Sequence, residues 1–119
     1  MGPESPDNPT DESFSCTVAV RPTYAMAYAH GDLDITTVGR LTAQLAPLAE
    51  AGGEIVVDLS DLGFLGSAGL RALAKLDEIA TAAGGCLLLA GMPQFVHRLL
   101  SIAGMDGQFA AADIPPEIH

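Results

Sequence analysis

Basic residues are scarce in this chain of 119 residues. Five lysines and arginines stand against 15 aspartates and glutamates, so the formal net charge is −10 at pH 7. Proteins that bind nucleic acid or an anionic membrane surface need clustered Lys and Arg side chains to neutralise phosphate groups. The composition therefore argues against both kinds of partner, whereas a basic protein partner is compatible with it.

Cysteines and long apolar runs are scarce as well. The two cysteines, Cys16 and Cys86, lack CxxC spacing and lie in apolar runs, so we expect reduced core residues. A disulfide between them would require that their strands lie side by side.

No apolar run approaches the ~20 residues that span a bilayer. The first residues are acidic and Pro-rich, unlike a signal peptide, so we expect a cytoplasmic chain without membrane association.

Apolar residues make up 49% of the chain, which is enough for one domain with a single core. Their spacing alternates between the repeat of a strand and the repeat of a helix. Strands are expected at residues 14–20, 24–30, 54–59, 86–90 and, as a short last strand, 108–111. Helices are expected from an N-cap at Asp34 to a Gly-Gly pair at 52–53, at residues 67–83, and from about Pro93 to Gly104.

The order of these elements is β-β-α-β-α-β-α, with a possible final strand. Two βαβ crossovers imply a partly parallel sheet with helices over at least one face. This predicts an α/β fold with a mixed sheet of four to five strands covered by helices. Pro47 is expected to kink or end the first helix. Residues 1–12 are expected to form a disordered leader and residues 112–119 a loose tail.

Residues 54–79 are the central segment of the chain. We expect them to form a buried strand, a short loop and an amphipathic helix. The turn at residues 65–69 is built from small residues, and a helix start exposes unpaired N–H groups. A partner surface or an anion could lie there. Ser67 has two interpretations: an N-cap hydroxyl, which we favour, or a phosphoacceptor, since a phosphate at a helix start is stabilised by the helix dipole.

Three segments of the chain resemble the motifs of STAS domains, the family of bacterial anti-sigma factor antagonists. They are residues 58–70, residues 31–34 (Gly-Asp-Leu-Asp) and residues 96–104, in the family's order. The resemblance covers about residues 14–109 and implies a STAS domain over residues 13–111. The usual family turn is Asp-Ser-Ser-Gly-Leu, and its second Ser is phosphorylated.

This chain departs from the family turn at two positions. Gly66 replaces the Asp, Ser67 matches the first Ser, Ala68 replaces the phosphorylated Ser, and Gly69 and Leu70 match. The resemblance implies a contact surface formed by Asp34, Gly66, Ser67, Ala68, Gly69, Leu70 and, at its rim, Arg71. Because Ala68 has no hydroxyl, we expect partner binding that is either unswitched or switched through Ser67.

The resemblance implies a non-catalytic function. Its expected partner is an anti-sigma factor that is also a Ser/Thr kinase, and binding would free a sigma factor for transcription. A weak homodimer is kept open as a further association. Two alternatives are a scaffold STAS domain in a signalling complex and a sensor of a small anion or nucleotide at the helix start.

Catalytic and metal sites are not expected from the sequence. A nucleophile elbow needs Gly two residues on each side of the Ser, and Leu65 occupies one of these positions. The three histidines are scattered without an HxxxH or HExxH pair, which argues against zinc. Asp32 and Asp34 lack the later Gly and Glu of a calcium loop. Asp58, at a strand end, is expected to be structural, with Ser60 and Asp61 as partners. No cofactor is expected.

Overall fold

The computed structural model describes residues 13–105 and 109–112. The elements are β1 (Phe14–Val20), β2 (Ala25–Leu33), α1 (Val38–Glu50), β3 (Glu54–Leu65), α2 (Ser67–Ala82), β4 (Cys86–Ala90), α3 (Gln94–Ile102) and β5 (Ala110–Ala112). This order confirms the α/β fold and the sequence of elements expected from the periodicity. The expected leader and residues 113–119 of the expected tail lie outside the described residues, whereas Ala112 belongs to β5.

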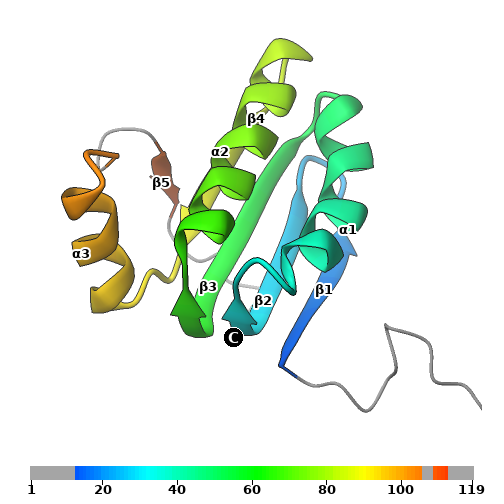
Figure 1. Cartoon of the computed structure of the whole chain (residues 1–119). Helices are drawn as coiled ribbons and strands as arrows, with labels where there is room; N and C mark the ends of the chain where they lie inside the picture. The colour runs from blue at the N-terminus through cyan, green and yellow to red at the C-terminus, as the bar shows by residue number, and fades with distance from the viewer. Residues whose placement is uncertain (1–12, 106–108, 113–119) are drawn as a thin grey trace, which may run out of the picture.

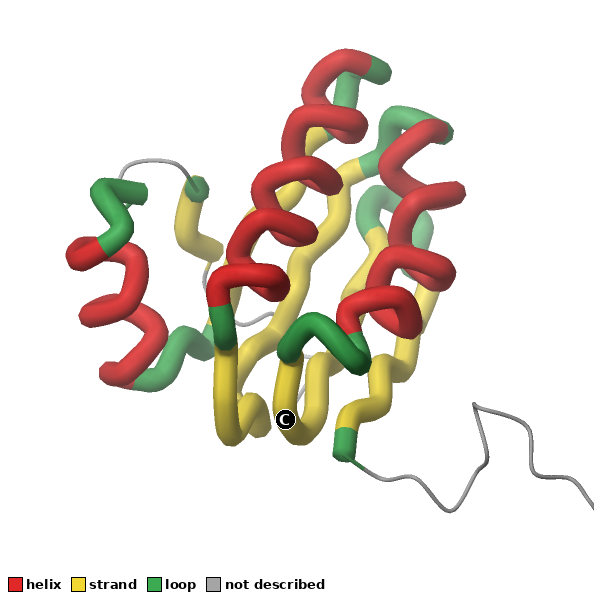
Figure 2. The backbone as a smooth tube through the Cα atoms, viewed as in Figure 1, coloured by secondary structure: helices red, strands yellow, loops and turns green. Residues whose placement is uncertain are grey.

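The sheet has five strands in the order β1-β2-β3-β4-β5. β1 and β2 are antiparallel, and each later pair is parallel, so the sheet is mixed as expected. Helices α1 and α2 lie side by side over one face, and α3 lies beyond them near β5 (Figure 1). The tube in Figure 2 shows how α1 and α2 each return the chain to the start of the next parallel strand.

The main core lies between this face of the sheet and the helices. Alternate residues of a strand point to opposite faces, so Ile55 and Val57 of β3 face α1 and α2 while Val56 faces away. Leu41 and Leu45 of α1 meet this layer from above, and both are fully buried. A smaller cluster on the other face contains Met26, Val56 and Ala90.

β3 is longer than the sequence indicated. It runs to Leu65, so the loop expected after Leu59 is wrong. β2 also continues, to Leu33, and after two register shifts Leu33 pairs with Leu65. Ser60 and Gly63 are typical turn residues and lie at the two register shifts. Asp61, Leu62 and Phe64 beside them pair with β2, and local preference cannot reveal that pairing. Both strands therefore project toward the start of α2.

α1 differs from expectation at its start and at Pro47. Thr37, and not Asp34, occupies the N-cap position, and the helix begins at Val38. The Asp34 carboxylate instead accepts hydrogen bonds inside the preceding turn. Pro47 lies inside the helix, which continues to Glu50, so Pro47 does not end it.

The cysteines are free, as expected for reduced residues. Cys16 lies on β1 and Cys86 on β4, and two strands separate them, so no disulfide joins them. Burial raises the pKa of the Cys16 thiol to about 11, which keeps it protonated and unreactive at neutral pH. In the ranges that the structure describes, no helix combines the length and apolar character needed to cross a membrane.

Candidate partner-binding site at the start of α2

The start of α2 is fixed to the end of β2 by a single residue. Gly66 joins β3 to α2 and occupies the N-cap position with extended backbone. Its N–H donates to the carbonyl of Leu33 at 3.1 Å, and its own carbonyl accepts from the N–H of Leu70 at 3.1 Å. The first turn of α2 is therefore bonded both to β2 and to itself. Such a helix start is held in place before any partner arrives.

Gly69 lets this helix start lie close to the two strand ends. A Cβ atom at Gly69 would lie 2.7 Å from Leu65 Cδ1 and 3.1 Å from the Leu33 carbonyl oxygen. Such distances leave no room for a side chain. Gly69 thus permits a close approach between α2 and the two strand ends of this chain. The sequence had suggested instead that a partner approaches the small residues of this turn. Leu70 is 4% exposed and belongs to the same core.

Ser67 is the first residue of α2, and Gly66 precedes it as the N-cap, so the N-cap interpretation of Ser67 is wrong. The Ser67 side chain is exposed, and α2 has no side-chain hydrogen bond at its N-cap, Gly66. Ala68 is half-buried, and Arg71, one turn later, is exposed. The accessible part of the helix start therefore consists of Ser67 and Arg71, with Gly66 and Ala68 beside them.

Asp34 lies at the same end of the molecule, directly after the residue that binds Gly66. Its carboxylate accepts from the hydroxyl of Thr36 at 2.7 Å and from the N–H groups of Thr36 and Thr37 at 2.9 and 3.2 Å. These hydrogen bonds, led by that from the Thr36 hydroxyl, hold the pKa of Asp34 below its usual value. Asp34 is therefore a fixed negative charge beside the start of α2.

Two exposed apolar side chains at this end escaped the sequence analysis. Ile35 is 74% exposed and Phe64 is 50% exposed. The ring of Phe64 lies over Gly66, with its Cε2 atom 3.1 Å from where a Cβ of Gly66 would be. The alternation of β3 offered a signal, because Leu65 faces the core and Phe64 must face away. The assumed loop after Leu59 hid that signal.

The other candidate groups have structural explanations. Asp58 is buried on β3 and accepts from the Ser60 N–H at 2.9 Å and the Ser60 hydroxyl at 2.7 Å, as expected for a structural carboxylate. Asp61 pairs with His30 instead. In the part of the chain with described placement, no three His, Cys, Asp or Glu side chains are grouped so that they could hold a metal ion.

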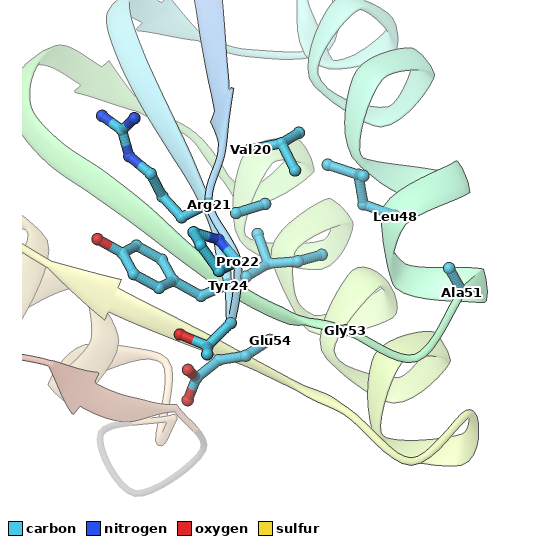
Figure 3. Close-up of a pocket in the computed structure, with 11 residues that line it drawn as sticks. Val20, Arg21, Pro22, Tyr24, Leu48, Ala51, Gly53 and Glu54 are labelled. Atoms are coloured by element: carbon cyan, nitrogen blue, oxygen red, sulfur yellow. The ribbon is translucent and has the colours of Figure 1, made fainter.

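A cavity of about 230 Å³ lies at the opposite end of the sheet (Figure 3). It is formed by the turn between β1 and β2, the end of α1 and the start of β3. Its lining is mainly apolar and includes Val20, Pro22, Leu48 and Ile55. None of the residues that the sequence predicted for a site lies in it, so the cavity and the start of α2 are separate features.

Comparisons with known proteins place these features in a family context. A family model described as "Mlab, STAS domain" matches residues 26–115. The anti-sigma-B factor antagonist of Bacillus subtilis (strain 168) is 29% identical over 75 residues, which are 63% of this chain and 69% of that protein. An anti-sigma factor antagonist from Mycobacterium paratuberculosis has a similar structure, with a TM-score of 0.73, 24% identity and coverage of 88% of both chains.

The anti-sigma factor antagonist SpoIIAA in its unphosphorylated form is a further structural neighbour. Its TM-score is 0.70 at 19% identity, over 88% of this chain and 90% of that chain. At such low identity the two structural likenesses show a shared fold. The matched sequence region includes the ends of β2 and β3 and the first turn of α2.

Proposed function

The chain belongs to the STAS domain family, and on this premise we propose that it is a cytoplasmic anti-sigma factor antagonist without catalytic activity. In this proposal it binds an anti-sigma factor that is also a Ser/Thr kinase, and this binding releases a sigma factor. The observation that carries the proposal is the start of α2. Its turn resembles the family's at Ser67, Gly69 and Leu70. It is accessible at Ser67, and it is held to β2 through Gly66.

The contact surface we propose is formed by Asp34, Gly66, Ser67, Ala68 and Arg71. Gly69 and Leu70 are buried, so their contribution is to position the first turn of α2 against Leu33 and Leu65. A preorganised surface loses little conformational entropy on binding, which favours affinity. The fixed backbone of this turn thus supports a role in recognition.

The regulation of this antagonist would differ from that of its family. Ala68 occupies the position of the family's phosphorylated Ser and has no hydroxyl. Ser67 is exposed, but successive residues on a helix point about 100° apart. Its hydroxyl therefore points away from the direction in which the family presents its own. We propose that binding is either unswitched or switched through Ser67.

The test is a pull-down from native lysate with the full chain as bait and Mg-ATP present. The retained proteins and the intact mass of the bait are both measured. We expect an anti-sigma factor kinase on the bait, with no phosphoryl group added or with one on Ser67. No retained kinase, or a phosphoryl group on a Thr far from the start of α2, would contradict the proposal.

A pair of bulky variants locates the contact. Ser67→Trp places a large side chain on the proposed surface and should abolish retention of the kinase, because it prevents close packing at the interface. Ser101→Trp introduces the same change at an exposed serine of α3 and should leave retention unchanged. Equal retention by both variants would place the contact elsewhere.

The missing hydroxyl at Ala68 also favours a second candidate, a scaffold domain in a larger signalling complex. Such a domain would need a binding surface but no phosphorylation switch. A stable homo-oligomer or a larger complex without a kinase, isolated in the same pull-down, would favour this function.

A further inference from the structure

We infer that Ile35 and Phe64 form an apolar patch that docks into an apolar hollow of a protein partner, and that basic residues of the partner meet the acidic rim formed by Asp32, Asp34 and Asp61. The inference rests on the proposed function, because it describes the partner of the same site. It adds the residues that anchor the partner and the chemistry that the partner must present.

The hydrogen bond between Gly66 and Leu33 brings the two chain segments that carry the apolar patch together at the start of α2. Ile35 follows Leu33 by two residues, and Phe64 precedes Gly66 by two residues. Ile35 is 74% exposed and Phe64 is 50% exposed. Two large apolar side chains left in water beside a preorganised turn are typical of contact anchors, since anchors gain most when they enter a pocket.

The acidic rim is formed by one carboxylate on β2, one on β3 and one in the turn after β2. Asp32 is exposed and pairs across the strands with Phe64. Asp61 is 70% exposed and lies 3.5 Å from His30. The hydrogen bonds within the turn keep Asp34 ionised. Arg71 on α2 is exposed, and His30 lies beside Asp61.

The charge of the rim selects the class of partner. An anionic membrane would be repelled by the three carboxylates of the acidic rim. A second copy of the chain would bring two acidic rims together, and like charges across an interface are unfavourable. A protein that surrounds an apolar hollow with Lys and Arg satisfies both the apolar patch and the acidic rim.

The experiment compares baits in the same lysate and then measures affinities for the kinase that the wild-type bait retains. Phe64→Ser and Ile35→Ser remove the anchors from exposed positions, so the fold should be kept, which circular dichroism and the thermal midpoint verify. Ile102→Ser is the matched control, because Ile102 is 77% exposed on α3. We expect each anchor variant to bind about tenfold more weakly or worse, and the control to stay within about twofold.

The rim is tested by the salt dependence of the same affinities. Asp32→Asn should weaken binding at low salt and flatten its dependence on NaCl, since one screened attraction is lost. Glu50→Gln, at the far end of α1, changes the charge equally and should alter neither quantity. A dependence on NaCl that is the same in Asp32→Asn and wild type would overturn the role of the rim.

The outcomes separate this inference from the proposed function. A kinase retained equally by wild type, Phe64→Ser and Ile35→Ser overturns the inference and leaves the proposed function standing. A retained protein without a kinase domain, lost only from the two anchor variants, overturns the proposed function and supports the patch. A wild-type bait that retains no protein overturns both.

Discussion

At the scale of single residues, Gly69 links the proposed binding surface to the core. Its backbone approaches Leu33 and Leu65 so closely that an added Cβ would meet a backbone oxygen, which cannot move aside as a side chain can. Overpacking of this kind costs about 1–3 kcal/mol. Ala gains up to about 1 kcal/mol over Gly in a helix, so it offsets part of that cost.

We expect Gly69→Ala to lower the free energy of unfolding by about 1 kcal/mol, measured by urea denaturation. Gly39→Ala is the matched control, because Gly39 lies within α1 and no atom lies within 4 Å of its added Cβ. That variant should gain about 0.5 kcal/mol from helix propensity and the less flexible unfolded chain. A stabilised Gly69→Ala variant would show that the start of α2 can move away from Leu33.

The residues of the site were predicted from the sequence only in part. The pattern of small residues located the turn, and the structure places Ser67 and Ala68 at the first turn of α2. The role of Gly69 depends on Leu33, which is 36 positions away in the sequence, so no local pattern contains it. The exposure of Ile35 and Phe64 likewise depends on how β2 pairs with β3.

At the scale of whole elements, Pro47 interrupts the hydrogen-bond pattern of α1, and the sequence alone overstates the effect of this proline on the helix. Pro47 has no N–H and so cannot complete the hydrogen bond to the carbonyl of Ala43 one turn earlier. The helix nevertheless continues, because Leu45 and Ala49 on either side of Pro47 are fully buried against the core. Tertiary packing thus outweighs the local cost of the proline.

Pro47→Ala should therefore stabilise the protein. The interior position of a helix favours Ala over Pro by about 3 kcal/mol, and the added freedom of the unfolded chain removes up to about 1 kcal/mol of that gain. We expect a net increase of about 2 kcal/mol in the free energy of unfolding, measured by urea denaturation. Pro22→Ala, in the exposed turn after β1, regains no helical hydrogen bond and should give no increase. Equal effects of the two substitutions would contradict this reasoning.

The ends of some elements could be predicted from the sequence, whereas the end of β3 could not. Strands β1 and β4 and helix α2 match the expected ranges within a residue, because apolar periodicity marks both of their ends. The second half of β3 was missed, since Ser60, Asp61 and Gly63 favour turns by themselves. The extension of β2 pairs with Asp61, Leu62 and Phe64, so the strand continues through the two register shifts at which Ser60 and Gly63 lie.

At the scale of the whole molecule, charge acts against the fold and, in our proposal, in favour of binding. The chain carries 15 acidic and 5 basic residues, so repulsion between carboxylates opposes the compact state. The ion pairs found among residues 13–105 and 109–112 include Lys75–Glu78 at 3.9 Å and His30–Asp61 at 3.5 Å, and all four side chains are at least 66% exposed. Exposed ion pairs contribute little to stability, so salt that screens them lowers the free energy of unfolding only slightly.

Added NaCl should therefore move stability and binding in opposite directions. Raising NaCl from about 20 to 500 mM shortens the Debye length below the spacing of most surface charges, so it screens the repulsion and should raise the thermal midpoint by about 3 °C. The same change should weaken the complex with a basic partner, because that attraction is screened too. Differential scanning calorimetry and titration of the partner over one salt series measure both effects. A midpoint that fell as NaCl rose would contradict this expectation. It would show that attraction between opposite charges in the folded chain outweighs the repulsion between its carboxylates.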